Sequence, residues 1–505
     1  MKTTLFLFQL LIPVSLLAQT AKIKIDVERP IGEIDPKIYG VFMEPIHRKS
    51  GNPDTSKMNT VYGNLYNPSS PLADENGFRK DYINAMKELK ISNMRWPGGN
   101  FVSGYNWQDG IGPKEQRPVR VNLAWGGIDN NHVGTDEWMK LNQSIGSENI
   151  VCVNLGLANI MDAVYWVEYC NYKGGTYYSD LRAKNGHKEP YNVRIWDLGN
   201  EVDGFPWELG HKNADDYVEI AREAAKAMKS VDNSIKLVAS GSSWYEPQNT
   251  WLDWNHKVLT GIGDKIDYLS IHRYWENSPD YYTYMGASAK DFEEKIKLTA
   301  NEIESVSTAK GLKNPIYISV DEYGSFGRSF LNVLPVAQSL NSFIRHADVV
   351  KMGNFTMMTS LLSNDPQKGT FKSPLFYTFK LFSNNCRGSA IDTYVACDTF
   401  SAGKYKGIPY LDVSSVYSKE NGSVIINVVN RHKDKPINAE ILNTSGDFAG
   451  KAMASEMEVS DLTASFVFDK QQQYIPVTKE AIAKGNTIVY SFPPHSFTQI
   501  IAKVR

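Results

Sequence analysis

One stretch of the sequence decides the fold: Val193-Arg194-Ile195-Trp196-Asp197-Leu198-Gly199-Asn200-Glu201. It begins as an apolar run that is typical of a buried strand, and it stops at the polar triplet Gly-Asn-Glu. A glutamate at the carboxyl end of a parallel strand points into the mouth of a barrel or sheet rather than into its core. We therefore expect Glu201 to lie in a pocket, with Asn200 beside it as a partner for a substrate hydroxyl group.

A second stretch has the same pattern, an apolar run that ends at a carboxylate. Residues 315–324 are Pro-Ile-Tyr-Ile-Ser-Val-Asp-Glu-Tyr-Gly, an apolar, β-branched run that breaks off at Asp321 and Glu322. Two glutamates at the ends of two strands suggest one reaction, the cleavage of a glycosidic bond by a pair of carboxyl groups. The residues alone therefore point to Glu201 and Glu322 as a catalytic pair.

The chain around these stretches alternates between short apolar runs and segments with helical periodicity. We expect strands at residues 38–43, 92–96, 150–155, 193–198, 235–239, 266–272, 316–321 and 349–357. We expect helices at residues 78–89, 136–145, 161–172, 214–231, 251–259, 289–308 and 333–347. Strands that alternate with helices form a parallel sheet, and eight such units close into a (β/α)8 TIM barrel, an α/β fold.

The pattern changes near residue 393. Short alternating strands are expected at residues 413–417, 423–430, 466–468, 487–490 and 498–501, separated by Gly, Asn and Pro. They predict a C-terminal antiparallel β-sandwich, to which an early strand at residues 23–27 also fits. We therefore predict a catalytic barrel at residues 38–385 and a sandwich domain formed by residues 19–37 and 386–505.

Composition agrees with a two-domain soluble protein. The chain has 505 residues, of which 42% are hydrophobic and 22% charged. A net charge of -2 gives no reason to expect nucleic acid or a membrane surface as a partner. Aromatic residues make up 12% of the chain, which is typical of sugar-binding clefts but also of large barrels that bury many rings.

The N-terminus has the pattern of a secretory signal. Lys2 supplies a positive charge, an apolar run follows from Leu5 to Leu17, and Ala18 is a small residue at a cleavage point. The run is shorter than the roughly 20 apolar residues that span a membrane. We therefore predict a signal peptide at residues 1–18 and an exported protein, either periplasmic or extracellular.

The four cysteines are Cys152, Cys170, Cys386 and Cys397, and their spacing fits no metal or redox motif. Cys152 and Cys170 are predicted to be buried free thiols. A disulfide between Cys386 and Cys397 is an open alternative, because export permits such bonds.

Four motifs together resemble a known family. Residues 95–107 are Arg-Trp-Pro-Gly-Gly-Asn-Phe-Val-Ser-Gly-Tyr-Asn-Trp, and residues 196–204 are Trp-Asp-Leu-Gly-Asn-Glu-Val-Asp-Gly. Residues 271–274 are Ile-His-Arg-Tyr, and residues 321–324 are Asp-Glu-Tyr-Gly. These strings resemble the family 51 glycoside hydrolases, chiefly α-L-arabinofuranosidases, and the resemblance covers residues 38–357, with weaker agreement beyond them.

The resemblance implies a barrel followed by a sandwich, and a retaining double displacement on terminal arabinofuranosyl groups. It assigns Glu201 as the acid/base and Glu322 as the nucleophile. In a retaining enzyme the two carboxyl groups lie about 5–5.5 Å apart.

The resemblance also implies a set of substrate-binding residues, each of which has a purely structural alternative. Glu44 would hold sugar hydroxyls, Arg95 would orient carboxylates near Glu322, and Asn100 and Asn200 would bind hydroxyls. His272 and Tyr274 would line the pocket, with Tyr274 placed to hydrogen-bond the nucleophile, and Trp107 and Trp125 are candidate platforms for a sugar ring.

One departure from the family concerns the substrate. Many arabinofuranosidases have a Gln at the end of the eighth strand, where this chain has Met357, and Met cannot supply the hydrogen bonds of an amide. The segment Pro45-Ile46-His47 after Glu44 is also unusual. Two alternatives therefore stay open beside an exo-acting arabinofuranosidase: an endo-acting retaining glucanase or xylanase, and a carbohydrate-binding protein without catalysis.

The expected partner is an arabinose-containing plant polysaccharide or oligosaccharide. No metal or other cofactor is expected, because the carboxyl groups carry the chemistry and no ligand spacing is found. The family resemblance is also compatible with a homo-oligomer.

Overall fold

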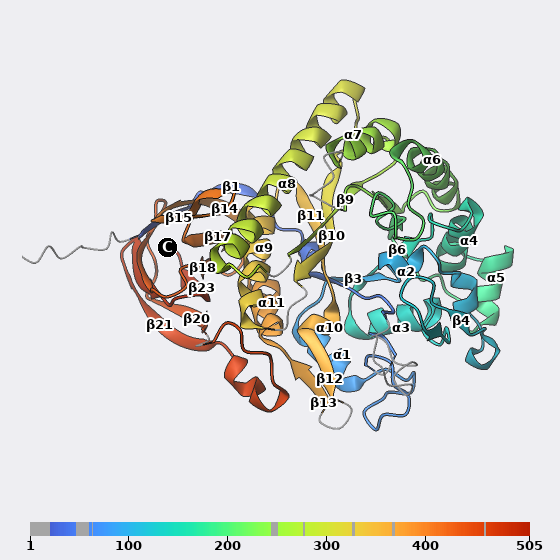
Figure 1. Ribbon diagram of the computed structural model, residues 1–505, viewed down its shortest axis with the longest axis horizontal. Helices are drawn as coiled ribbons and strands as arrows, with labels where there is room; N and C mark the ends of the chain where they lie inside the picture. Colours follow the sequence, from blue (N-terminus) through green and yellow to red (C-terminus); the bar gives the residue numbers. More distant parts are fainter. Residues whose placement is uncertain are drawn as a thin grey trace, which may run out of the picture.

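The computed structural model describes residues 21–46, 60–62, 64–243, 251–275, 278–325, 329–365, 369–458 and 461–505. The predicted signal peptide at residues 1–18 lies outside the described residues, as does His47 in the unusual segment after Glu44. Two rounded bodies lie side by side, one built on a parallel barrel and the other on a β-rich domain (Figure 1).

The first body is a closed parallel barrel, as predicted. Within the described residues its strands run in chain order around the ring, and the last strand pairs with the first. The strands are β2 (Gly40–Phe42), β3 (Asn93–Trp96), β6 (Glu148–Val153), β7 (Ile195–Leu198), β8 (Lys236–Ala239), β9 (Tyr268–Trp275), β10 (Tyr317–Ser325) and β11 (Val350–Phe355). All eight lie at the predicted positions, because each is an apolar run long enough to be recognised by composition.

A small apolar cluster fills the lower part of the barrel. It contains Ile150, Ile195, Val238, Tyr268 and Met352, one residue from each of five strands. Side chains two residues apart on a strand point to the same face. Asp197, two residues after Ile195 on β7, therefore also points inward, and the polar groups that follow lie above this cluster.

Helices surround the barrel (Figure 1). The larger ones are α1 (Lys80–Glu88), α3 (Thr135–Ile145), α4 (Ile160–Asn171), α6 (Ala214–Val231), α7 (Trp251–Ile262), α8 (Tyr281–Lys310), α9 (Val333–Arg345) and α11 (Pro374–Asn385). The shorter ones are α2 (Gly99–Val102), α5 (Tyr177–Lys184) and α10 (Met358–Leu361). None of the helices described is both long and apolar enough to cross a membrane.

Helix α8 begins earlier than its predicted start at residue 289. Asp280 caps it, and its carboxylate accepts a hydrogen bond of 2.8 Å from the backbone N–H of Thr283. Such a cap satisfies a backbone donor that the first turn leaves open. The extra turns contain Tyr281, Tyr282 and Tyr284, whose aromatic content obscured the helical pattern in the sequence.

The second body is an antiparallel β-rich domain, as predicted, but its sheet is closed and does not form an open sandwich. Its strands close into one continuous sheet in the order β1-β14-β17-β18-β23-β20-β21-β22-β19. They are β1 (Ala21–Glu33), β14 (Ser389–Ala396), β17 (Leu411–Ser418), β18 (Ser423–Asn430), β19 (Ile437–Asn443), β20 (Lys451–Met457), β21 (Val477–Lys484), β22 (Thr487–Phe492) and β23 (Ser496–Lys503).

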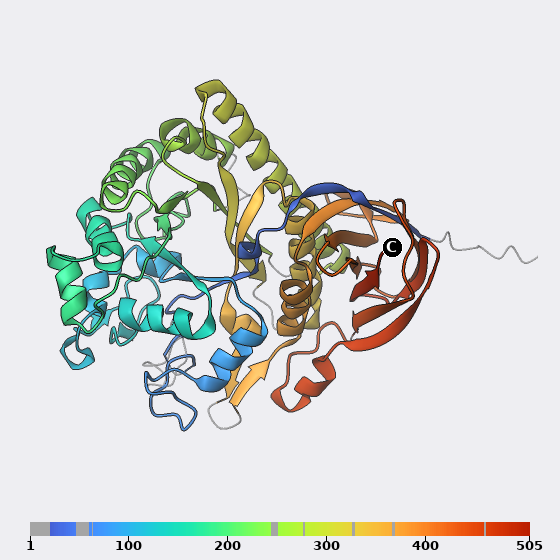
Figure 2. The ribbon, with the colours of Figure 1, turned by 180° about the vertical axis from the view of Figure 1, so that it is seen from behind.

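Strand β1 closes this sheet although it comes from the other end of the chain. It pairs antiparallel with β14 and parallel with β19. Figure 2 shows β1 in blue, running from the barrel across to the orange and red strands. The first described strand, β1, therefore belongs to the same sheet as the C-terminal strands. The domain boundaries at residues 38 and 386 stay a prediction.

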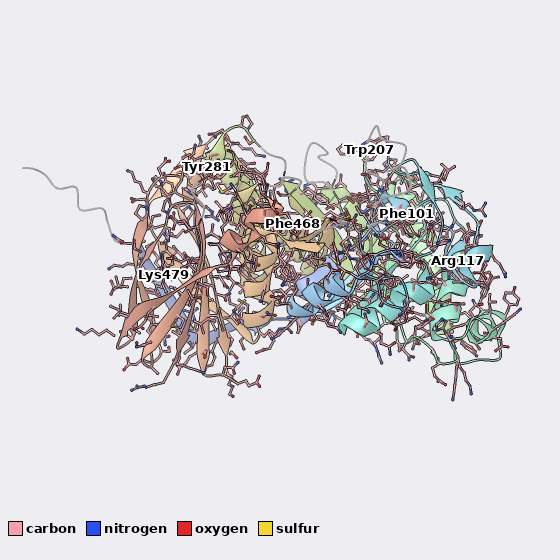
Figure 3. The ribbon with its side chains drawn as sticks, turned by 90° about the horizontal axis from the view of Figure 1, so that it is seen from below. Phe101, Arg117, Trp207, Tyr281, Phe468 and Lys479 are labelled. Carbon is pink, nitrogen blue, oxygen red and sulfur yellow. The ribbon has the colours of Figure 1, made fainter. Side chains whose placement is uncertain are left out.

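Residues 466–468 were predicted as a strand, and this is wrong. Phe468 begins a 3-10 helix (Phe468–Tyr474), and the ring of Phe466 packs against Tyr474 at 5.9 Å. The ring of Phe468 packs against Phe371 of β13 at 5.9 Å, near the middle of the molecule in Figure 3. The alternating aromatic residues therefore anchor a loop, and not a strand of the sheet.

The described chain also contains three separate two-stranded sheets, and hydrophobic periodicity did not predict them. They pair β4 (Arg120–Val121) with β5 (Ile128–Asp129), β12 (Leu362–Asp365) with β13 (Gly369–Lys372), and β15 (Thr399–Ala402) with β16 (Tyr405–Pro409).

All four cysteines are free thiols, and Cys386 and Cys397 do not pair. Cys386 is buried, and the amide of Asn427 donates to its sulfur at 3.3 Å. The backbone N–H of Leu411 donates to the sulfur of Cys397 at 3.5 Å. The prediction of buried free thiols is confirmed for Cys152 and Cys170.

Helix α9 joins the two bodies. It lies between the barrel and the second sheet (Figures 1 and 2), and it contacts β17, β18 and β23. Arg345 at its end forms an ion pair of 3.0 Å with Asp412 of β17, and Arg431 forms another of 2.9 Å with the same carboxylate. The contact between the bodies is thus both apolar and ionic.

Candidate active site

The predicted pair of glutamates meets at the carboxyl ends of the barrel strands. Glu201 follows β7, and Glu322 lies in β10 directly beside His272 of β9. One carboxylate oxygen of each glutamate and one ring nitrogen of His272 lie within 4.8 Å of one another. The barrel therefore brings together three residues that are far apart in the sequence.

Glu201 lies in a tight turn at the end of β7. Gly199 has a φ of 89°, and Glu201 itself has a φ of 43°. A positive φ is uncommon for a residue other than glycine and is often found at functional sites. The Nδ1 atom of His272 lies 2.7 Å from Oε1 of Glu201, so the turn holds this carboxyl against the imidazole.

Glu322 is buried and held at both oxygens. The guanidinium of Arg95 donates to Oε1 at 2.8 Å, and the hydroxyl of Tyr274 donates to Oε2. Burial raises the pKa of Glu322, and the charge of Glu201 raises it further, whereas His272, Arg95 and Tyr274 lower it. The net result is a raised pKa, with three neighbours that favour the ionised form.

The neighbours of His272 favour its charged form. Burial alone would lower its pKa, but Glu322, Asp321 and Glu201 together raise it well above the usual value. Its Nε2 atom lies 3.3 Å from Asp321, and its Nδ1 atom faces Glu201. Both ring nitrogens therefore carry protons and act as donors to carboxylates.

Arg95 lies under the pair, fully buried on β3. Its Nε donates to Asp197 at 2.5 Å, and its Nη2 donates to the side-chain oxygen of Asn200 at 2.8 Å. With the bond to Glu322, one guanidinium on β3 thus connects the ends of β7 and β10. The arrangement fits the planar fork of an arginine, which binds several acceptors in fixed directions.

Asp197 and Asp321 also contact Arg95, and no role was predicted for them from the sequence. Asp197 pairs with Arg95 and is buried, and burial raises its pKa to about 7 despite the nearby cation. Burial also acts to raise the pKa of Asp321, but Arg95 and His272 lower it overall. A charged residue in the middle of an otherwise apolar strand was the signal that could have found both.

Asn200 leaves a donor for a ligand. Its Oδ1 is taken by Arg95, and its buried Nδ2 has no hydrogen-bond partner among the residues described. A buried amide group without a partner is costly unless a ligand or water completes it. Asn200 therefore has an amide donor available at the site, and its role in binding a hydroxyl group stays a prediction.

Glu44 lies at the end of β2 and is also buried. Its Oε1 accepts from the indole of Trp125 at 2.6 Å and from the backbone N–H of Phe101 at 2.7 Å. Burial raises its pKa well above the usual value, and Glu322 adds to this effect. A Cβ atom on Gly99 would lie 2.1 Å from this carboxylate, so a glycine is required there.

The three remaining predicted residues are Asn100, Trp125 and Trp107, and they differ in their surroundings. Asn100 lies close by in α2, where its side-chain oxygen accepts from the backbone N–H of Leu209 at 2.8 Å. Trp125 is half-buried and reaches Glu44, whereas Trp107 is buried and stacks on Trp166 at 5.7 Å. Trp107 therefore acts in packing, whereas Trp125, like Tyr274, contacts an acid of the site.

Met357 follows β11, next to the strand that carries Glu322, and it is half-buried. It is thus at the strand end where the family resemblance suggested a Gln.

Glu208 is a further acid that the sequence analysis missed. It is 5% exposed, and burial together with the charges of Glu201, Asp203 and Glu322 raises its pKa to about 10. Its Oε2 lies against Gly204 and has no hydrogen-bond partner in the described part of the chain. No strand or helix pattern marks this loop residue, so only the structure could place it near the pair.

Trp207, which precedes Glu208, is 62% exposed, and Figure 3 places it with Phe101 on one side of the barrel body. The loop after β7 therefore presents an aromatic ring to solvent beside the buried acids.

Among the described residues, Glu201, His272 and Glu322 also have the spacing of three metal ligands. In the charged form of His272, which its acidic neighbours favour, neither ring nitrogen has a lone pair to offer a cation. The positive groups Arg95 and His272 contact these carboxyl groups directly.

A parallel barrel with paired carboxyl groups at its strand ends defines a glycosidase site. Comparison with known proteins agrees: the family profile of the α-L-arabinofuranosidase 1 domain matches residues 85–280, and that of the α-L-arabinofuranosidase C-terminal domain matches residues 326–496. The chain belongs to family 51 of the glycoside hydrolases, the α-L-arabinofuranosidases.

Individual relatives are similar over most of their length. The intracellular exo-α-(1→5)-L-arabinofuranosidase 1 of Bacillus subtilis is 36% identical, over 82% of this chain and 85% of that protein. The intracellular exo-α-(1→5)-L-arabinofuranosidase of Halalkalibacterium halodurans is 36% identical, over 83% of this chain and 87% of that protein. The solved structure of the GH51 α-L-arabinofuranosidase from Thermotoga petrophila has a TM-score of 0.84 and 31% identity, over 95% of this chain and all of that one.

These relatives contradict the prediction that the protein is exported. The two bacterial proteins at 36% identity are named intracellular. The prediction relied on a short apolar run after one lysine, and such a pattern records composition over a few residues only. Similarity over more than four-fifths of the chain is the stronger evidence.

Proposed function

We propose that this protein is an exo-acting α-L-arabinofuranosidase that releases terminal non-reducing α-L-arabinofuranosyl residues by a retaining mechanism. The observation that carries the proposal is the spacing of the two carboxyl groups, with oxygens within 4.8 Å. Retaining glycosidases hold their carboxyl groups about 5–5.5 Å apart, whereas inverting enzymes leave about 6.5–9.5 Å for a water molecule.

Glu322 is the nucleophile of the first step. Its ionised carboxylate attacks the anomeric carbon, and the bond from that carbon to the leaving oxygen breaks. Arg95 and Tyr274 donate to its oxygens, and His272 adds a positive charge nearby, so the reactive form is stabilised although the residue is buried.

Glu201 is the acid and then the base. It gives its proton to the leaving oxygen in the first step, and in the second it takes a proton from the water that attacks the anomeric carbon. The bond between the sugar and Glu322 breaks in that second step. His272 donates to Oε1 of Glu201, so the transferred proton is carried on Oε2.

The sugar is bound by the polar groups around the pair. The amide of Asn200 has a free donor in the described chain, Glu44 offers a carboxyl group, and Asn100 and Trp125 complete that side of the pocket. The names of the similar bacterial proteins specify an exo-acting enzyme on α-(1→5)-linked arabinofuranosyl units. Arabinan or arabinoxylan side chains are therefore the proposed substrates.

The two alternatives are less well supported. An endo-acting glycanase needs an open cleft with several sugar platforms, whereas Trp107 is buried in packing. A binding protein without catalysis does not need two carboxyl groups at this spacing. Assembly into a homo-oligomer stays a prediction.

The proposal is tested by hydrolysis of an aryl α-L-arabinofuranoside beside the aryl β-xyloside and β-glucoside. We expect turnover of the arabinofuranoside, reduced about 10²–10⁴-fold in Glu201→Ala, and at least as strongly in Glu322→Ala. Glu219→Ala, an exposed glutamate of α6, is the matched control and should be unaffected. Turnover of another glycoside but not of the arabinofuranoside would contradict the proposed substrate.

A further inference from the structure

Lys295 is a buried cation close behind the active site. It belongs to α8, and its side chain is 0% exposed. Lysine is almost never fully buried unless its ammonium group has partners. No part of the proposed mechanism uses this residue, so its burial calls for an explanation.

The ammonium group of Lys295 holds two strand ends together. Its Nζ donates to the backbone carbonyl of Ser242 at 2.9 Å and to that of His272 at 3.1 Å. Ser242 follows β8, and His272 lies in β9. The carbonyl of Ser242 also accepts a hydrogen bond of 3.4 Å from the backbone N–H of His272, so the two chain segments are joined at one point.

A third segment is attached at the same place. The backbone N–H of Ser243 donates to Asp203 at 2.7 Å, and the hydroxyl of Ser243 donates to the same carboxylate at 2.5 Å. Asp203 is two residues beyond Glu201 in the turn after β7. The residues that follow β7 and β8 and the strand β9 are thus connected through Lys295 and Asp203, and they carry both Glu201 and His272.

Lys295 can keep this contact in either protonation state. Burial lowers its pKa to about 7, although the nearby charges of Asp203 and Glu201 favour the ammonium form and Arg273 opposes it. A neutral amine still has two N–H groups, one for each of the two carbonyls. The hydrogen bonds therefore define the role, whether or not the charge is present.

We propose that Lys295 is a positioning residue of the active site, which fixes the backbone of His272 and thereby holds its imidazole against Glu201. The proposal rests on the function proposed for Glu201. Since Nδ1 of His272 lies 2.7 Å from Oε1 of Glu201, a displacement of the His272 backbone would move the proton donor away from the leaving oxygen.

The test is the dependence of the rate on the leaving group. Proton donation matters most for a poor leaving group and little for one that departs unaided. We would measure kcat/KM for Lys295→Met on 2,4-dinitrophenyl α-L-arabinofuranoside and on α-1,5-arabinobiose. We expect the ratio of the two rates to shift about tenfold or more against arabinobiose, with the change in kcat rather than in KM.

Two further variants make the test decisive. Lys297→Met removes an exposed lysine of the same helix and should leave the ratio unchanged. Lys295→Gln keeps amide donors on a shorter side chain and should shift the ratio in the same direction, by less, which gives a second measurement if Lys295→Met does not fold. A folded Lys295 variant with the wild-type ratio would overturn the proposal. Absence of any arabinofuranoside turnover by the wild type would instead refute the proposed function.

Discussion

Arg95 and His272 are positive groups that favour the ionised form of the carboxyl groups around them. Each is buried, and each contacts carboxylates from different strands. Buried charges are expensive unless they are paired and hydrogen-bonded, so the cations and the acids are stable only together. The nucleophile and the acid/base therefore depend on neighbours that do not react themselves.

The hydroxyl of Tyr274 helps to keep Glu322 ionised, which gives a prediction about pH. In Tyr274→Phe the hydrogen bond to Oε2 is lost, and the pKa of Glu322, already raised by burial, rises further. Because the nucleophile must be ionised, activity is lost as the pH falls through this pKa. We expect the acid limb of the kcat/KM profile to move to higher pH by about one unit, since a hydrogen bond to a charged group contributes about 1.5–3 kcal/mol.

Tyr268→Phe is the matched control, because Tyr268 lies on the same strand in the apolar cluster of the barrel. Its acid limb should coincide with that of the wild type. An acid limb that stays in place in Tyr274→Phe, or moves to lower pH, would show that this hydroxyl does not stabilise the ionised nucleophile.

The sequence predicted the residues of the site that carry a pattern of their own. Glu201 and Glu322 were found because each ends an apolar run, and Glu44, Asn100 and Trp125 through a family resemblance. Glu208 and Lys295 could not be found in this way, because one lies in a loop and the other has helical neighbours that give no sign of burial. Their roles depend on which strand ends lie near them in space.

Among the elements, the buried barrel strands were predicted, whereas an exposed strand of the second sheet was missed. The eight barrel strands are apolar runs, whereas β21 (Val477–Lys484) is mostly exposed and reads Val-Thr-Lys-Glu-Ala-Ile-Ala-Lys. A strand without an alternating apolar face gives no periodic signal. Pairing with β20 and β22 defines it as a strand, and that pairing is not local in sequence.

Helix α8 carries an ionic cluster that links it to α9. Glu293 accepts from Arg345 Nε at 2.7 Å and from Ser342 at 2.7 Å, and it faces His346 at 2.6 Å. Burial would raise the pKa of Glu293, but Arg345 and His346 hold it well below its usual value. A carboxylate with a lowered pKa stabilises the fold above its unfolded pKa, and this contribution is lost as the pH falls towards the folded pKa.

Glu293→Gln should therefore destabilise the protein in a pH-dependent way. We expect a loss of about 2 kcal/mol in the free energy of unfolding at pH 7, which shrinks as the pH falls below about 4.5. Urea unfolding at several pH values measures this difference.

The exposed Glu304 of the same helix provides the control variant Glu304→Gln, which should show little effect at any pH. A difference between Glu293→Gln and the wild type that grew as the pH fell would contradict the assignment of Glu293 as a stabilising carboxylate.

In the whole molecule, an ionic cluster around Asp412 links the two bodies. Asp412 of the second sheet pairs with Arg345 of α9 and with Arg431, and the amide of Asn341 donates to it at 2.8 Å. Because Asp412 is buried, removing its charge would leave the guanidinium of Arg431 without its carboxylate partner and Arg345 with Glu293 alone.

We expect Asp412→Asn to lose about 3 kcal/mol of stability and to unfold in two calorimetric transitions where the wild type has one. Asp392 of β14 is half-buried and pairs with the exposed Arg29, and the control Asp392→Asn should change the melting temperature little. A single transition at the wild-type temperature in Asp412→Asn would show that the apolar contacts of α9 suffice to couple the bodies.

Glu201 and Glu322 are proposed to act as a retaining pair, and the stereochemistry of the first product distinguishes this mechanism from a single displacement. Proton NMR during hydrolysis of an aryl α-L-arabinofuranoside distinguishes the α and β anomers before they equilibrate in water. The spacing of the two carboxyl groups predicts that α-L-arabinofuranose forms first. Initial formation of the β anomer would mean a single displacement, and it would contradict the assignment of Glu322 as the nucleophile.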